Sequence, residues 1–135
     1  MRVLAILMAV AVFTASCTDP TPPAAPSPVL PTITETFSGT LTVGGHNLHP
    51  FTVQQVGGIR VSLTSVDPSA LVSLGVGTPS ASTGSCAVIT GLNAIGSTDV
   101  QISGTATVAG NFCVSVADPG SLVESVNYTV VVLHS

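Results

Sequence analysis

From about Glu35 onward, alternation of apolar and small polar residues is the dominant pattern, and this period of two constrains the fold more than any other feature. Turn-forming pairs such as Gly57-Gly58 and Asp67-Pro68 divide the alternation into short segments. Charged helix formers are scarce, because charged residues make up only 6% of the chain and Lys is absent. The pattern therefore predicts short strands, each with one apolar face that must pack against a second sheet.

Eight strands are expected in this region, and together they predict an all-β fold, an antiparallel β-sandwich. Their expected ranges are 36–43, 50–56, 59–66, 71–76, 86–90, 99–108, 111–116 and 126–134. The last strand is apolar on both faces from Tyr128 to Leu133, so it lies either at the centre of a sheet or in an interface between protomers. Phe37, Phe51 and Phe112 fall on alternating positions and are expected in the core.

The N-terminus has the features of a targeting segment. An apolar run of eleven residues, Val3–Phe13, follows a positively charged start. The run is too short to cross a membrane, which takes about 20 apolar residues, and is typical of a secretory signal peptide. Two small residues and then Cys17 follow, an order that resembles the lipobox of bacterial lipoproteins. The resemblance implies removal of residues 1–16 and acylation of Cys17; an ordinary cleaved signal with an incidental cysteine is the alternative.

The next segment, residues 17–34, is expected to be a tether. Six prolines occur among the thirteen residues Asp19–Pro31, and proline excludes both helix and central strand. Such a segment favours extended polyproline II and reaches roughly 40 Å. It would hold the sandwich domain, residues 35–135, away from the membrane. The lipobox resemblance implies the outer membrane, because Thr18 is not an acidic retention signal.

The chain has three cysteines. If Cys17 is acylated, Cys86 and Cys113 remain as an even pair in an oxidising compartment, and we predict a disulfide between them. Closing that loop would stabilise the fold by roughly 3.5 kcal/mol in the chain-entropy model. Two buried free thiols and a reactive or metal-binding pair are the alternatives, and no C-x-x-C motif supports the latter.

The histidines offer the one candidate for a metal site. His46 and His49 form an H-x-x-H pair in the loop expected between the first two strands. Residues three apart in an extended segment point to opposite faces, and two ligands leave a zinc site incomplete. We therefore predict a pair of polar loop residues and no cofactor.

The sequence offers no catalytic group. No G-x-S-x-G nucleophile motif is present. The carboxylates of the domain are not paired in sequence, as general acid–base catalysis would require, and two of them precede proline, which marks turns. They are Glu35, Asp67, Asp99, Asp118 and Glu124. We predict that the protein is not an enzyme.

The composition also limits the classes of molecule that the protein could bind. Arg2 and Arg60 are the only basic side chains besides histidine, and the formal net charge is −4, which excludes binding to nucleic-acid phosphates. Sugar-binding sandwiches usually stack sugars on exposed aromatic rings, whereas the three Phe residues here are expected in the core. Tyr128 is left open, because its hydroxyl needs water or a partner.

Four segments together resemble the bacterial pre-peptidase C-terminal (PPC) domain family. They are S-G-T-L-x-x-G-G at 38–45, F-T-V-Q-Q-V-G-G-I-R-V-S-L at 51–63, L-V-S-L-G-V at 71–76 and G-N-F-C-V-S-V at 110–116. The resemblance implies a jelly-roll-like sandwich with a non-catalytic accessory role in secretion, adhesion or substrate contact. Some members of this family bind calcium through acidic residues near the first hairpin, but residues 46–50 contain no carboxylate, so calcium is not implied here.

These observations predict a non-enzymatic, lipid-anchored envelope protein whose sandwich binds or adheres to a protein or glycan of the envelope or the exterior. A structural protein whose copies associate edge to edge is the alternative hypothesis, and a hydrolase is the least favoured.

Overall fold

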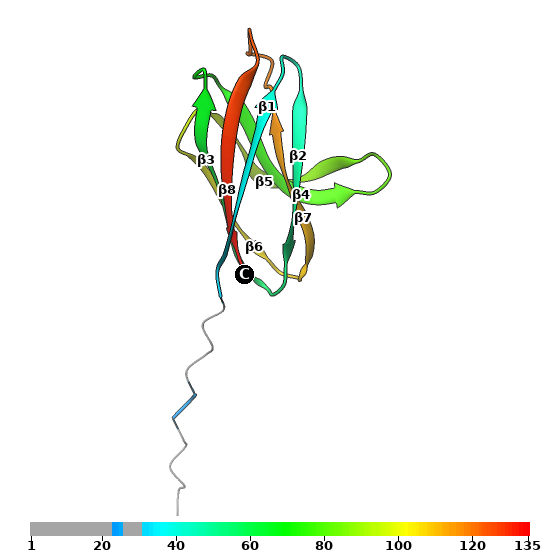
Figure 1. The fold of residues 1–135 in the computed structure, drawn as a ribbon. Helices are drawn as coiled ribbons and strands as arrows, with labels where there is room; N and C mark the ends of the chain where they lie inside the picture. The colour runs from blue at the N-terminus through cyan, green and yellow to red at the C-terminus, as the bar shows by residue number, and fades with distance from the viewer. Residues whose placement is uncertain (1–22, 26–30) are drawn as a thin grey trace, which may run out of the picture.

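Eight strands make up most of the described chain, which comprises residues 23–25 and 31–135 of the computed structural model (Figure 1). They are β1 (Ile33–Leu41), β2 (His46–Val53), β3 (Gly57–Asp67), β4 (Val72–Ser80), β5 (Ser85–Gly96), β6 (Val100–Ala106), β7 (Gly110–Ala117) and β8 (Val126–His134). No described segment forms a helix with the length and hydropathy that a membrane crossing requires.

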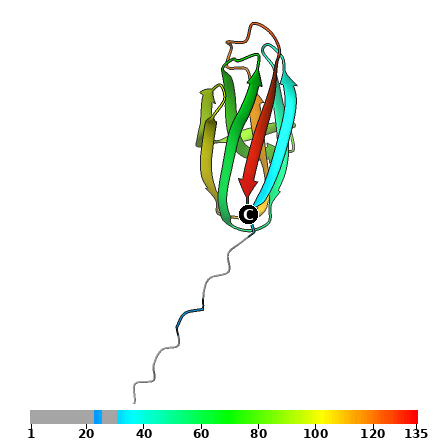
Figure 2. The ribbon, with the colours of Figure 1, turned by 60° about the vertical axis from the view of Figure 1, so that its left-hand side comes forward.

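The first four strands pair with the last four in reverse order: β1 with β8, β2 with β7, β3 with β6 and β4 with β5. The chain is thus one long hairpin, rolled up so that β8 also pairs with β3 and β7 with β4. Two antiparallel sheets result, β1-β8-β3-β6 (sheet A) and β2-β7-β4-β5 (sheet B). They form an elongated sandwich with loops at both ends (Figure 2). This strand order is that of a jelly roll, and it confirms the predicted antiparallel sandwich.

All eight strands overlap the ranges expected from the sequence, but several ends differ. β1 starts at Ile33, two residues before the expected start of the domain. The prediction that His46 and His49 lie in a loop was wrong, because both belong to β2. Residues 77–85, which separate the fourth and fifth expected strands, are mostly paired as well. Cross-strand pairing sets these ends, as where His46 pairs with Ala117, and local composition does not encode it.

Inward-facing side chains from both sheets form one continuous core. Phe51 and Phe112 are buried there with ring centroids 5.9 Å apart, as predicted, whereas Phe37 on edge strand β1 is only half-buried against the core. Most of the other core residues are β-branched or leucine, which pack well between pleated sheets. The fully buried ones include Val61, Leu63, Leu74, Val116, Val130 and Val132.

Strand β8 lies between β1 and β3 at the centre of sheet A. This position explains why the segment Tyr128–Leu133 is apolar on both faces. Its inner residues Tyr128, Val130 and Val132 are buried in the core, and the neighbouring strands half-cover Val131 and Leu133 on the outer face. Of the two alternatives for this strand, the centre of a sheet is therefore the one observed.

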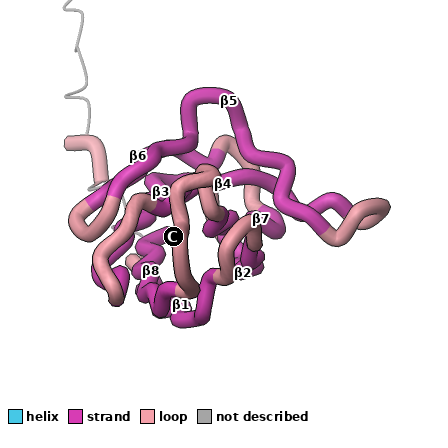
Figure 3. Tube along the Cα trace, turned by 90° about the horizontal axis from the view of Figure 1, so that it is seen from above, coloured by secondary structure: helices cyan, strands magenta, loops and turns pink. Residues whose placement is uncertain are grey.

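Strand β5 leaves the plane of sheet B partway along its length. Its pairing with β4 shifts between Gly75 and Gly77, where β5 inserts extra residues. Beyond the shift, residues 77–88 form a two-stranded ribbon, here called the arm, that projects beyond β7 and β2 (Figures 1 and 3). Glycine makes this crossing possible: a Cβ at Gly77 would collide with the backbone of Ala87, and one at Gly75 would lie 2.8 Å from the Val88 side chain.

The two ends of the sandwich are distinct. Ile33 pairs with His134, so β1 begins where β8 ends, at the end of the sandwich next to the C-terminus, called the proximal end (Figure 1). The β1–β2, β3–β4 and β7–β8 connections lie at the opposite, distal end, because β1 and β3 finish where β8 begins. A strand of nine residues separates the two ends by roughly 30 Å.

We expect Gly77→Ala to lower the free energy of unfolding by about 1–3 kcal/mol, because the added methyl group overpacks the crossing of β4 and β5. Urea unfolding measures the change. Gly58→Ala is the matched control, since a Cβ there meets nothing within 4 Å. Equal midpoints for the two variants would contradict the role assigned to Gly77.

Candidate functional site

The sandwich is open along one side, between edge strands β1 and β2, and polar side chains line this opening, here called the seam. The Nε2 atom of His49 lies 2.7 Å from the hydroxyl of Tyr128, a residue that is 2% exposed. The Phe37 ring stacks on the His49 imidazole with centroids 5.0 Å apart. Burial raises the pKa of the Tyr128 hydroxyl and lowers the pKa of His49, so at neutral pH this contact joins two uncharged groups.

A second polar pair occupies the proximal part of the seam. The Nε2 atom of His134 lies 2.8 Å from Oε1 of Glu35, and the imidazole also packs against the Phe51 ring at 5.3 Å. His134 is buried, whereas the Glu35 side chain keeps about a third of its surface exposed. The pair thus satisfies the hydrogen-bonding needs of an otherwise buried imidazole.

The Glu35–His134 pair was not predicted, because the two residues are 99 positions apart in the sequence. A signal was present, since both residues occupy inward positions of their strands, where the alternation otherwise places apolar side chains. A polar residue at such a position needs a partner, but the sequence does not name the partner without the β1–β8 register.

These groups do not form a reactive constellation. His46 and His49 point to opposite faces of β2, as expected for residues three apart, and His46 is exposed. Within residues 23–25 and 31–135, no three His, Cys, Asp or Glu side chains gather in a way that could hold a metal ion. His49 and His134 are both engaged within the fold, next to aromatic rings.

Cys86 of β5 and Cys113 of β7 form the predicted disulfide, with an S–S distance of 2.04 Å. The bond fastens the base of the arm to the outer face of sheet B and covers Cys113, which is fully buried although it points outward. Without it, the arm would be a two-stranded ribbon of marginal stability. Cys17, the predicted site of acylation, lies outside the described residues.

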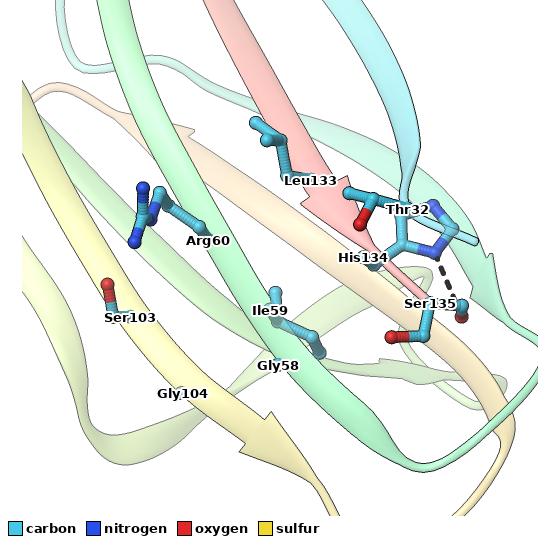
Figure 4. A pocket seen from close by; sticks show the side chains of 9 residues that line it. All are labelled: Thr32, Gly58, Ile59, Arg60, Ser103, Gly104, Leu133, His134 and Ser135. Atoms are coloured by element: carbon cyan, nitrogen blue, oxygen red, sulfur yellow. Dashed lines mark hydrogen bonds between the residues drawn. The ribbon is translucent and has the colours of Figure 1, made fainter. Parts of the chain in front are cut away.

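A hollow of about 330 Å³ lies on the outer face of sheet A near the proximal end (Figure 4). Arg60 borders it, in register with Ser103 of β6 on one side and Leu133 of β8 on the other. Thr32 and Ser135 lie across the hollow (Figure 4). Among its lining side chains, Arg60 is the only Lys or Arg, and a single exposed guanidinium does not define an anion site.

A second cleft, of about 290 Å³, lies at the distal end between the β3–β4 and β7–β8 connections. Its lining is mainly apolar, with Glu124 as the charged member. Leu71 and Val123 on its rim are 51% and 93% exposed, so two exposed aliphatic side chains border the same apolar cleft. The apolar lining residues are Pro68, Ala70, Leu71, Leu122, Val123 and Val126.

Asp118 fixes the shape of the distal loops. Its Oδ2 accepts a 2.8 Å hydrogen bond from the Gly44 amide in the β1–β2 connection. Its Oδ1 accepts bonds of 2.8–3.1 Å from the amides of Gly120, Ser121 and Leu122. These amides, that of Gly44 foremost, hold the pKa of the carboxyl below its usual value. One ionised side chain therefore joins two of the loops at this end.

Asp118 was predicted as a turn residue, but the distal cleft was not predicted. The signal for it is the adjacent pair Leu122-Val123, which breaks both the alternation and the polar character expected of a loop. Leu122 points into the fold and is buried, whereas Val123 is left in solvent.

Comparison with known proteins identifies a shared fold. No family model and no curated protein matches the chain. Among solved structures, it is similar to the crystal structure of Aeromonas hydrophila PliG, a periplasmic lysozyme inhibitor of g-type lysozyme. The TM-score is 0.54 at 16% identity, and the match covers 75% of this chain and 86% of that one. The likeness supports the sandwich architecture, and the resemblance to the PPC family stays a prediction.

We expect acidification from pH 7 to pH 5 to destabilise the protein through His49. Because its pKa is lower in the folded than in the unfolded state, the unfolded chain binds more protons as the pH falls through this range. The stabilising contribution is complete above the unfolded pKa of about 6.5 and is lost as the pH falls through the folded value.

The Tm measured against pH tests this. His49→Asn should lower the Tm at pH 7 and flatten its fall toward pH 5. His46→Asn, on the opposite face of the same strand, is the matched control and should leave the profile unchanged. A His49→Asn profile parallel to that of the natural protein would show that burial of this imidazole does not drive the pH dependence.

Proposed function

We propose that this protein is an exported lipoprotein whose β-sandwich binds another protein and carries out no reaction itself. Acyl chains on Cys17 would anchor it to the envelope, with the outer membrane as the expected site, and residues 17–34 would serve as the tether. The distal end of the sandwich would meet the partner.

The distal cleft carries this proposal. Leu71 and Val123 expose aliphatic surface around this apolar cleft. Ser and Thr are abundant in the chain but do not occupy these two positions. Exposed apolar patches of this kind on a folded domain mark interaction sites. The cleft also lies at the end of the sandwich opposite Ile33, where the tether joins, so an anchored molecule would hold it away from the membrane.

The absence of a reaction is supported by the way the scarce ionisable groups are used. His49, His134 and Glu35 satisfy one another or a buried hydroxyl in the seam, and Asp118 accepts backbone hydrogen bonds. General acid–base catalysis needs a group free to exchange a proton with a substrate. The similarity to an inhibitor protein is consistent with a binding role, and a g-type lysozyme is the natural first probe.

The anchoring is tested by mass spectrometry of the natural protein under non-reducing conditions. We expect a chain that begins at Cys17, carries the mass of acyl groups on that residue and retains the Cys86–Cys113 bond. Cys17→Ala should release the protein from the membrane fraction. A mature chain that begins at Cys17 without added mass, or begins at another residue, would show that the N-terminal segment is an ordinary signal peptide.

The binding surface is tested with a photo-crosslinking amino acid placed at Val123 in the full-length protein in its own cells. We expect a discrete covalent adduct with one protein. The same amino acid at Thr105, exposed on the outer face of sheet A, is the matched control and should give no such band.

The identity of the adduct separates the hypotheses. An adduct with a different protein supports the binding module. Inhibition of a g-type lysozyme by the purified protein would identify the class of that partner. An adduct with a second copy of this chain would favour the structural alternative. Adducts of equal yield at Val123 and Thr105, or none at either, would remove the distal cleft as the contact surface.

A further inference from the structure

We infer that the distal cleft takes an aliphatic side chain from a positively charged segment of the partner protein, so that Lys or Arg residues flank the inserted side chain. This inference rests on the proposed protein-binding function and specifies the chemistry of the partner. Three features of the distal end carry it: the size of the cleft, the distribution of charge over the molecule, and the freedom of two carboxylates beside the cleft.

The cleft suits one or two side chains. Its volume of about 290 Å³ is small for a ligand site, and its walls are aliphatic apart from two serines and Glu124. The walls come from two different connections, Pro68–Leu71 and Ser121–Val126, and Asp118 fixes the second of these against the β1–β2 connection. A preformed apolar cleft with exposed rim residues is the usual receptor for a single anchoring side chain at a protein interface.

Charge is distributed unevenly along the sandwich. Of the five carboxylate side chains in the described part of the chain, Asp67, Asp118 and Glu124 lie in or beside the distal connections, and Asp99 lies in the nearby β5–β6 turn. Arg60, the only Lys or Arg in the same residues, lies three positions from the proximal start of β3. The distal end therefore attracts cations, and an acidic surface steers a cationic partner toward the cleft.

The carboxylates differ in what they already bind. Glu35 is paired with His134, and Asp118 is saturated by backbone amides. Asp67 and Glu124 are exposed, and neither takes part in an ion pair or side-chain hydrogen bond among the described residues. Glu124 lines the cleft, and Asp67 directly precedes the lining residue Pro68. Asp99 is likewise exposed and makes no such contact among the described residues, but of these three carboxylates only Glu124 lines the cleft and only Asp67 adjoins a lining residue in sequence.

Screening by salt limits the distance over which these carboxylates act. At physiological ionic strength, screening reduces charge–charge interactions beyond about 8 Å, so a carboxylate affects binding mainly when the partner's cation lies next to it. Glu124 lines the cleft and Asp67 directly precedes the lining residue Pro68, whereas Asp99 in the β5–β6 turn neither lines the cleft nor adjoins a lining residue in sequence. Asp99 therefore offers a control with the same change of charge at the same end.

The experiment measures adduct yield from the crosslinker at Val123 in the full-length protein, in three backgrounds. We expect Asp67→Asn combined with Glu124→Gln to lower the yield at least fivefold, and Asp99→Asn to lower it less than twofold. Peptide mapping of the adduct should place the attachment next to an aliphatic residue within a few positions of Lys or Arg. Retention of the Cys86–Cys113 bond and of the natural Tm confirms that each variant is folded.

The outcomes separate the two proposals. No adduct at Val123 in the natural background overturns the proposed function together with this inference. A protein adduct that persists at full yield in the double variant, or maps to an acidic or uncharged segment, overturns the cationic partner while leaving protein binding in place. An equal loss of adduct yield in the Asp99→Asn variant would show that binding depends on net charge alone, and would contradict the role assigned to Asp67 and Glu124. Attachment to glycan in place of protein contradicts both.

Discussion

The pairing of the first half of the chain with the second half in reverse order is the constraint on which the rest of the structure depends. It places β8 between β1 and β3, so the last strand holds the first one in sheet A. It also brings Glu35 to His134 and His49 to Tyr128, pairs that local sequence does not join. Because nearly all of these contacts are distant in sequence, the sandwich forms only as a whole, and its polar groups are satisfied only in the complete register.

The strand content was predictable because it follows from alternation, which is a local property. All eight strands were expected near their observed positions, and the Cys86–Cys113 bond followed from counting cysteines. The errors concern positions where tertiary pairing overrides composition. Residues 46–49 and 77–80 contain histidine, glycine, proline and serine, which suggested loops, yet the pairing of β2 with β7 and of β4 with β5 makes them strands.

The candidate site was less accessible from sequence, for a physical reason. A cleft between two connections depends on how far each loop stands from the other, and that distance is set by β3 and β8 and not by the loop residues. The sequence marks both Asp67 and Asp118 as turn residues, but their roles differ. The carboxylate of Asp118 accepts hydrogen bonds from backbone amides, whereas Asp67 is exposed to solvent. The Leu122-Val123 pair, which is apolar in a segment expected to be a polar loop, was one sequence signal of the cleft.

A chain with so few charged residues makes the position of each charge informative. Burial of Glu35 beside His134 in edge strand β1 sets an ionisable group on the inner face of an exposed edge, a device that discourages edge-to-edge pairing. Pro50 has the same effect on the other exposed edge, β2, because it cannot donate to a further strand. With both edges along the seam protected, lateral association there is opposed, and the distal end remains the surface best suited to contact. Ile33, where the proposed tether would join, lies at the opposite end, so anchoring and binding would not compete for space.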